Sequence, residues 1–429
     1  MDNHIKHPIQ LTFGDNGHTL HNNQIESFDE NFLVFDTRND DTKISETPHI
    51  KILDIITKKI STIYSTQNQT EFGPGVGAAA FSPIHNKVIF IHGIRNATGL
   101  KPYSATRRTG VAIDLEKPNQ PIFMDARNIY SPFTTGALRG GTHSHSWHEN
   151  GKWISFTYND FVIEETSKTD DSIKDQRVVG IMYPEKVEVP LDKNFENNSG
   201  EMFSIIVSKV VTNAKYDTDE IEKAFDECWI KSTNNIAFQG NVRDVNGNLK
   251  TEIFIASIPE KISISEKDDL VGTLKTLPSV PVCISQKRIT TTKNGISHLR
   301  HWLRSSPDGK IIYFLMEDDN KITQLFGVNL LDEKIIQYTF LEYSITSPFN
   351  ISGDGNYVVY YSNSKIMVTN LSEKNSKVVY NSLLYNNDLT GIPSFSLNGK
   401  NIYFNQFVPN KNNIKYIQIF SLQLLFTNN

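Results

Sequence analysis

A short unit, a polar turn followed by an apolar strand, recurs seven times along the 429 residues, and no other feature constrains the fold as strongly. The three clearest copies read SSPDGKIIYFLME (305–317), SGDGNYVVYYSN (352–363) and SLNGKNIYFNQF (396–407). Four weaker copies precede them: SFDENFLVFDTR (27–38), SPIHNKVIFIHGI (82–94), HENGKWISFTYN (148–159) and KSTNNIAFQGN (231–241). Repetition on this scale is typical of folds in which each unit buries its faces against the next copy.

Each unit reads as part of a small antiparallel sheet. Turns such as Pro307-Asp308-Gly309 reverse the chain, and the strand that follows, 311–314, is apolar throughout, as expected when both faces of a sheet are covered. A second polar gap and a further strand usually come next, which predicts units of four antiparallel strands. Seven such units around an axis make an all-β, seven-bladed β-propeller.

The predicted propeller is a single domain over 1–429, with insertions around 95–140 and 160–225, where the copies lie farther apart. The N-terminal segment IQLTF (9–13) has the pattern of a strand that closes the ring by joining the last blade. Two β-sandwiches are the alternative, which seven copies of one turn–strand unit disfavour.

Composition narrows the classes of function. The net charge is −5 and the isoelectric point is near 6.2, so no basic field favours nucleic acid. Cys228 and Cys283 lie in no zinc-binding spacing and argue against a disulfide framework. No apolar run reaches the roughly 18 residues of a membrane span, and the first residues lack the apolar core of a signal peptide. We expect a cytoplasmic protein, or a periplasmic one if an export signal has been removed.

The SPDG and SGDG turns and the leading QLTF resemble TolB-type propellers. Two longer stretches, RRTGVAID with RGGTHSHSWHENGKWISFTYND, and HLRHWLRSSPDGKIIYFLMEDD, resemble the bacterial YidR-like family. A more distant similarity is to oligogalacturonate lyase, a TolB-like propeller in which clustered histidines bind a divalent metal. In that family a lone histidine precedes a His-x-His pair, whereas here the pair comes first. The resemblance therefore implies a type of site and assigns no positions.

Histidines concentrate in the segments before the repeated turns, which would be the innermost strands of the blades. His143 and His145 are two residues apart, so on a regular strand both face the same side, and imidazole is a common metal ligand. A metal-free active site and plain packing in a polar channel are the alternatives. The predicted ligands of a divalent ion (Mn, Zn or Ca) are His143, His145, His298 and His18.

Arginine and aromatic side chains near the same segments indicate recognition of an anion, because guanidinium groups bind carboxylates in a bidentate geometry. Arg139 precedes two glycines that permit close approach of a ligand to the backbone, and it forms the predicted catalytic set with Tyr158 and His301. Each of these residues also has a structural reading, as an ion-paired arginine or a buried, hydrogen-bonded side chain. The predicted substrate-binding residues are Arg107, Arg108, Tyr103, Arg300 and Trp302.

Two functions of different classes follow. The first is a metal-assisted lyase that cleaves an anionic, uronate-containing oligosaccharide by β-elimination. The cation and Arg139 would neutralise the carboxylate and acidify the proton at C5, and Tyr158 or His301 would transfer protons. The second is a non-catalytic TolB-like propeller that binds a protein or glycan partner. The clustered histidines favour the enzyme, because a binding module does not need them.

Overall fold

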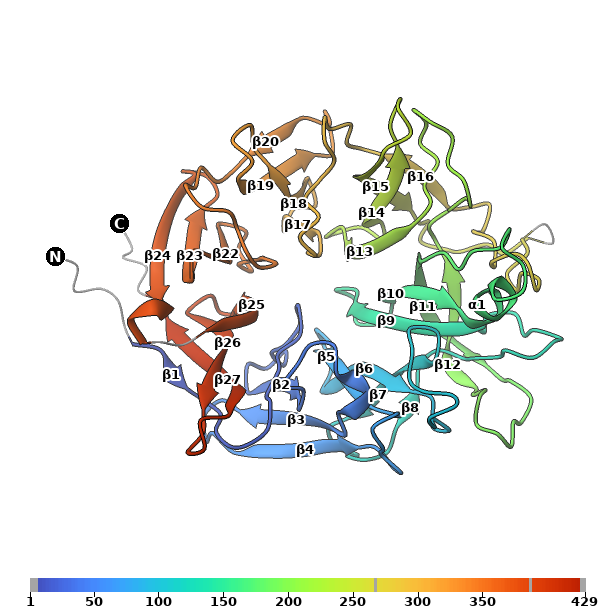
Figure 1. Ribbon diagram of the computed structural model, residues 1–429, viewed down its shortest axis with the longest axis horizontal. Coiled ribbons are helices and arrows are strands. Elements are labelled where there is room, and N and C mark those ends of the chain that lie inside the picture. Colours follow the sequence, from blue (N-terminus) through green and yellow to red (C-terminus); the bar gives the residue numbers. More distant parts are fainter. Residues whose placement is uncertain (1–6, 266–267, 386–387, 425–429) are drawn as a thin grey trace.

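Seven small β-sheets surround a central axis in the computed structural model, which describes residues 7–265, 268–385 and 388–424 (Figure 1). The sheets follow one another around the ring in chain order, and their first strands lie nearest the axis (Figure 1). This arrangement confirms the predicted all-β, seven-bladed propeller. Among the described residues, no helix is both long enough and apolar enough to cross a membrane.

Blades 2 to 6 each have four antiparallel strands that run in chain order from the axis outward. Blade 2 consists of β5 (Val76–Phe81), β6 (Lys87–Gly93), β7 (Arg108–Asp114) and β8 (Ile122–Phe123). Blade 3 consists of β9 (Gly140–Trp147), β10 (Ile154–Asp160), β11 (Val178–Val187) and β12 (Gly200–Ile206). Blade 4 consists of β13 (Ala224–Trp229), β14 (Ile236–Arg243), β15 (Leu249–Ser257) and β16 (Ser285–Arg288). Blade 5 consists of β17 (Arg304–Ser305), β18 (Ile311–Glu317), β19 (Thr323–Asn329) and β20 (Ile335–Gln337). Blade 6 consists of β21 (Asn350–Ile351), β22 (Tyr357–Ser362), β23 (Lys365–Asn370) and β24 (Asn375–Asn381), and a 3₁₀ turn, η2 (Ser382–Tyr385), follows it.

Blade 7 joins the two ends of the chain. Its outermost strand is β1 (Ile9–Gln10), which pairs with β27 so that Ile9 lies opposite Ser421. The backbone N–H of Leu11 extends the contact by donating to the carbonyl of Ile419 at 2.8 Å. The predicted closing strand is therefore confirmed. The other strands of this blade are β25 (Leu389–Phe395), β26 (Asn401–Pro409) and β27 (Lys415–Gln423).

Blade 1 departs from the four-stranded pattern. It has three strands, β2 (Phe32–Asp36), β3 (His49–Asp54) and β4 (Ile60–Ser65), with a 3₁₀ turn, η1 (Ile44–Glu46), between the first two. An irregular segment occupies the inner position and pairs with β2 at two isolated bridges, Thr19 with Asp36 and Glu26 with Leu33. Between these bridges the chain leaves the sheet, which places residues 20–25 near the axis.

The repeated turn is held by the same side-chain contacts in several blades. Oγ of Ser306 donates to Oδ1 of Asp308 at 2.6 Å and accepts the backbone N–H of Ile311 at 3.0 Å. These contacts give the hairpin its local geometry, as Ser and Asp side chains commonly do in turns. Equivalent contacts are made by Ser27, Ser352 and Ser396.

The apolar core lies between neighbouring blades. One cluster joins Val34 and Ile50 of blade 1 to Val88 and Phe90 of blade 2, and all four side chains are fully buried. Because each middle strand is covered on both faces, its sequence is apolar without alternation. The same packing repeats around the ring and explains why a unit of this kind is not stable alone.

Four inner strands carry a β-bulge near the axis. In β9, Ser144 and His145 together oppose the single residue Phe156, because His143 pairs with Thr157 and Ser146 with Ser155. A bulge of this kind bends the strand and re-aims its side chains. The bulged residues with positive φ are Ala78 (57°), Ser144 (59°), Asp226 (49°) and Gly391 (67°).

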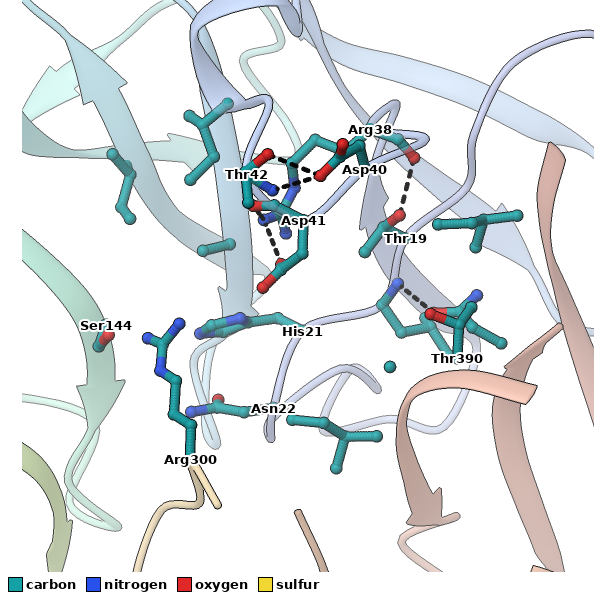
Figure 2. A pocket seen from close by; sticks show the side chains of 18 of the residues that line it. Thr19, His21, Asn22, Arg38, Asp40, Asp41, Thr42, Ser144, Arg300 and Thr390 are labelled. Carbon is teal, nitrogen blue, oxygen red and sulfur yellow. Dashed lines mark hydrogen bonds and ion pairs between the residues drawn. The ribbon is translucent and has the colours of Figure 1, made fainter. Parts of the chain in front are cut away.

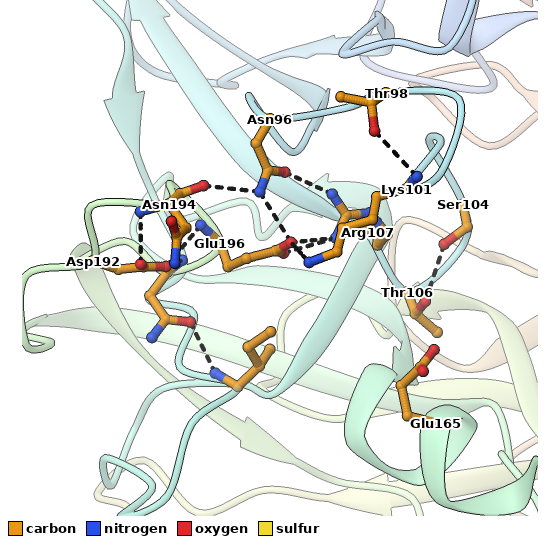
Figure 3. A network of polar contacts seen from close by, with 12 residues as sticks. Asn96, Thr98, Lys101, Ser104, Thr106, Arg107, Glu165, Asp192, Asn194 and Glu196 are labelled. Carbon is orange, nitrogen blue, oxygen red and sulfur yellow. Dashed lines mark hydrogen bonds and ion pairs between the residues drawn. The ribbon is translucent and has the colours of Figure 1, made fainter.

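The two predicted insertions meet beside blade 3. The region 160–225 contains helix α1 (Phe161–Ser167), but it also contains β11 and β12, so much of it belongs to the blade itself. The loop before β7 contacts the loop before β12 through a buried network (Figure 3). There, Nη1 of Arg107 donates to both carboxylate oxygens of Glu196, at 2.7 and 2.8 Å, and Asn96 donates to the same carboxylate at 3.0 Å.

Candidate functional site

A cavity of about 810 Å³ lies where the inner segments of the blades converge (Figure 2). Its wall combines the irregular segment 19–22 and the loop 38–42 of blade 1, the bulge of β9, and residues 390–392 of blade 7. This volume falls within the range of about 300–1,000 Å³ that is usual for small-molecule sites. This space, which we call the channel cavity, is therefore the leading candidate for a functional site.

Two arginines of this cavity are hydrogen-bonded to neutral groups. Arg108 donates from Nε to the carbonyl of Ala105 at 3.2 Å, and Arg177 donates from Nε to Oδ1 of Asn159 at 3.1 Å. Neither makes an ion pair with a carboxylate in the part of the chain that the structure describes. Burial lowers the pKa of both guanidinium groups, and a second arginine lowers each further: Arg300 acts on Arg108, and Arg108 acts on Arg177. Tyr103 acts in the opposite direction on Arg108, as do Asp226 and Asp175 on Arg177. Repulsion among the arginines costs stability unless an anion offsets it.

A third arginine, Arg300, extends over the cavity. Its guanidinium stacks on the ring of Trp302 at 4.6 Å and approaches the imidazole of His21 (Figure 2). Its side chain is 56% exposed, and its Nε lies 3.8 Å from Oδ1 of Asp226, too far for a hydrogen bond. Arg38 differs from these three arginines, because Asp36 and Asp41 neutralise it. The residues that line the cavity include four arginines and two aspartates, Asp40 and Asp41, so the lining carries more positive than negative charge.

Two neutral imidazoles complete the cavity. Both ring nitrogens of His143 and Nε2 of His21 are buried and have no hydrogen-bond partner among the described residues. Burial lowers the pKa of both rings well below 6.5, and Arg108 adds to this effect at His143, as Arg38 does at His21. Buried polar atoms without partners are rare in folded proteins. Both residues are among those that line the cavity, so a ligand bound there is the nearest group that could supply partners.

The bulge in β9 separates the two histidines of the His-x-His motif. Because Ser144 takes a left-handed conformation, the alternation of side chains is broken, and His143 and His145 do not share a face. His143 lines the cavity, whereas His145 is fully buried behind it, with Nε2 3.0 Å from Oγ1 of Thr142. The ring lies so close to β7 that a Cβ atom at Gly110 would be 2.7 Å from its Nε2.

The other two predicted metal ligands lie elsewhere. Nδ1 of His18 hydrogen-bonds to Oε1 of Gln418 at 2.9 Å, which ties the N-terminal segment to β27. His298 is exposed and lines a neighbouring cavity. No three His, Cys, Asp or Glu side chains in the described ranges are arranged to hold a metal ion. The structure thus does not assemble the predicted site of His143, His145, His298 and His18.

Two of the predicted catalytic residues form a buried structural cluster with Asp160. Arg139 donates to Oδ2 of Asp160 from Nη2 at 2.7 Å and from Nε at 3.0 Å, and the hydroxyl of Tyr158 donates to the same oxygen at 2.8 Å. All three side chains are fully buried, and none lines the cavity. The glycines after Arg139 admit neighbouring backbone rather than a ligand, since a Cβ at Gly140 would lie 2.0 Å from the carbonyl oxygen of Asn159.

His301, the third predicted catalytic residue, is also a structural group. Its ring is fully buried, and its Nδ1 lies 2.6 Å from the carbonyl oxygen of Leu299. Its Nε2 accepts the backbone N–H of Leu315 at 3.1 Å. Both nitrogens are therefore used to join the inner segment of blade 5 to β18.

Four of the five predicted substrate-binding residues do line the cavity: Arg108, Tyr103, Arg300 and Trp302. Arg107 does not, because its guanidinium is bound by Glu196 and Asn96 in the network between the two loops. That four of these residues bind a substrate stays a prediction. Two further cavity residues, His21 and Arg177, were not in the predicted set. The position of His21 in a histidine-rich inner segment was a usable signal, and Arg177, in a long polar stretch, offered none.

The buried ring of His145 gives a testable pH dependence. Burial lowers its pKa from 6.5 to about 3. Below about pH 6.5 the unfolded chain binds a proton that the native protein does not, so this residue makes the protein less stable as the pH falls. Between about pH 6 and 4, the free energy of unfolding should fall with decreasing pH in both proteins. The fall should be smaller in His145→Gln than in the wild type, by about 1.4 kcal/mol per pH unit. Urea denaturation across this range measures the difference, and equal slopes would contradict it.

The topology and the cationic cavity define a seven-bladed β-propeller with a polar site at one end of its axis. Residues 75–198 match the family described as "Protein of unknown function (DUF3748)". The chain is 32% identical over 366 residues to "Uncharacterized protein YidR" of Escherichia coli (strain K12), an alignment that covers 83% of this chain and 85% of the relative. The chain therefore belongs to the YidR family.

The chain is also similar to two solved structures. A structure described as oligogalacturonate lyase in complex with manganese aligns over 97% of this chain and 92% of its own, with a TM-score of 0.58 and 10% identity. TolB from Acinetobacter baumannii aligns over 92% of this chain and 80% of its own, with a TM-score of 0.40 and 13% identity. At such identities the first likeness shows the fold and does not carry function.

Proposed function

We propose that this protein binds an anionic, uronate-containing oligosaccharide in the channel cavity and cleaves it by β-elimination. The observation that carries the proposal is the group of three arginines, Arg108, Arg177 and Arg300, which surround neutral imidazoles with too few carboxylates to balance them. Guanidinium groups are well suited to carboxylates, which they bind through two parallel hydrogen bonds. Trp302 and Tyr103 in the same wall provide aromatic surface for a sugar ring.

The residues present do not fit the metal that the related fold suggests. The similar lyase is described in complex with manganese, and a divalent ion would need several histidine or carboxylate ligands at one point. Here His143 is the one predicted ligand in the cavity, and Arg108 and Arg177 act on it electrostatically. Their charge would repel a cation. In our proposal the arginines themselves neutralise the uronate carboxylate, and no metal is required.

The chemistry then depends on a base beside the bound carboxylate. Neutralising this group acidifies the C5 proton; a base removes that proton, a double bond forms between C4 and C5, and the C4 oxygen leaves with a proton from solvent. We assign the base to His143, whose nitrogens have no partners among the described residues. Burial lowers the pKa of His143 most, and the arginines lower it further; an anionic ligand offsets the charge of the arginines. The imidazole therefore becomes more basic when substrate is present.

The direct test is to incubate the purified protein with oligogalacturonates and to follow the ultraviolet absorbance of an unsaturated uronate product. Neutral oligosaccharides of equal length are the matched control and should give no product. We expect the activity to survive a metal chelator. If no unsaturated product forms from any uronate oligosaccharide, the lyase proposal is wrong.

A second candidate is a propeller that binds an anionic glycan without cleaving it. It is favoured by the placement of Tyr158 and His301, whose polar atoms are committed to structural hydrogen bonds away from the cavity. This leaves fewer groups for proton transfer than the sequence suggested. Tight binding of oligogalacturonate without any product would select this candidate over the lyase.

Both candidates require Arg108 for affinity. Arg108→Gln removes a charged donor, and the loss of one charge-assisted hydrogen bond, about 1.5–3 kcal/mol, should weaken binding of galacturonate oligomers by about 10- to 100-fold. Stability should not decrease, since the change also removes repulsion among the arginines. Calorimetric titration and thermal denaturation measure the two effects. Arg95→Gln is the control, because Arg95 is exposed and lies outside this cavity.

A further inference from the structure

A second, smaller cavity of about 310 Å³ adjoins the first at blades 4 and 5. Arg177 and Arg300 line both cavities, so the two spaces share a rim formed by these side chains. The lining of the second cavity includes the apolar side chains of Phe225 and Leu249. A volume of this size corresponds to the lower end of the range for small-molecule sites, about 300 Å³.

The second cavity is also lined by more cationic than anionic side chains. Nζ of Lys223 lies 4.7 Å from the ring centre of Phe225, and no carboxylate of the described residues forms an ion pair with it. Burial lowers the pKa of Lys223, and Arg177 lowers it further. Lys250 is different, because Glu252 lies 3.2 Å from its Nζ.

One carboxylate, that of Asp226, lies among these cations. Asp226 is 5% exposed and is placed there by the bulge in β13. Arg300, Arg177 and Lys223 all act on its charge. A single negative charge against three positive ones leaves an excess that a second anionic group can offset.

We propose that the second cavity binds a second acidic sugar, so that the ligand is a polyanionic oligosaccharide that extends across Arg177 and Arg300. This inference rests on the proposed function and specifies its substrate class: at least two consecutive uronate residues, one in each cavity. Of the three cations around Asp226, Lys223 lines only the second cavity, whereas Arg177 and Arg300 line both cavities.

The test is the dependence of affinity on ligand length. Galacturonate, its dimer and its trimer are titrated calorimetrically into the wild type and into Lys223→Gln. The wild type should bind the dimer and trimer at least about tenfold more tightly than the monomer, since each adds a charge-assisted contact. Lys223→Gln should lose about tenfold in affinity for the trimer and less than about twofold for the monomer. Lys215→Gln is the matched control, because Lys215 is 76% exposed and lies outside both cavities.

Two results would overturn the inference while the proposed function stands. The first is that the wild type forms unsaturated product but binds monomer and trimer equally. The second is that Lys223→Gln weakens the binding of monomer and of trimer to the same extent, which would place the effect of Lys223 in the channel cavity. If no galacturonate of any length binds, the proposed function fails, and this inference fails with it.

Discussion

Arg139→Met is expected to lower the free energy of unfolding by about 3–5 kcal/mol, the usual cost of removing one partner of a buried ion pair. Arg139 and Asp160 are both fully buried, and the substitution leaves the Asp160 carboxylate without its cation. Arg139 also donates to the carbonyls of Thr273 and Thr276, at 2.6 and 2.9 Å, which attaches the loop between β15 and β16 of blade 4 to blade 3. Urea denaturation near neutral pH measures the change.

The matched control is Lys186→Met. Lys186 pairs with Glu188 on the surface, where the two side chains are 57% and 69% exposed. Exposed pairs of this kind contribute about 0–1 kcal/mol. A loss of less than about 1 kcal/mol for Arg139→Met would contradict the structural role assigned here. It would also reopen the prediction that Arg139 is a catalytic residue.

His143→Gln is expected to slow formation of unsaturated product by about 10²–10⁴-fold, the usual contribution of a general base. Affinity for the oligosaccharide should change little, because Arg108, Arg177 and Arg300 remain in place. Stability should also change little, since neither nitrogen of His143 has a hydrogen-bond partner among the described residues. Initial rates, calorimetric affinity and thermal denaturation separate the three effects.

His85→Gln is the control, because His85 is exposed and lies away from the channel cavity. A second variant, His143→Ala, should regain part of its rate when imidazole is added, whereas a purely structural role would show no such rescue. Full activity in His143→Gln would mean that another group, with His21 first to be tested, removes the proton.

The architecture was predictable because its determinants are local. The hydrogen bonds of Ser306 with Asp308 and Ile311 span a few residues, and the same contacts recur in other blades. The apolar strand after each turn is buried between blades. Its continuously apolar sequence therefore indicates that both of its faces are covered. Even the closing strand β1 is a short apolar pattern that pairs through backbone hydrogen bonds.

The site was only partly predictable, because three of its features are not local. The bulge at Ser144 breaks the alternation on which the pairing of His143 with His145 depended. Arg139 appears exposed to a ligand in the sequence, yet its partner is Asp160 on the next strand. Arg107 and Arg108 are neighbours in the chain, but Glu196 binds Arg107 and leaves Arg108 to the cavity.

The sequence by itself therefore determined the propeller, its seven repeats and the strand that closes it, since each is written in short-range turns and strand composition. Tertiary structure alone decided which arginines and histidines share a cavity. The ring of blades brings Arg108, Arg177 and Arg300 together from distant parts of the chain, and burial sets the charge state of the imidazoles between them. Electrostatic interactions depend on distance in space and on burial, and neither can be read from separation along the chain.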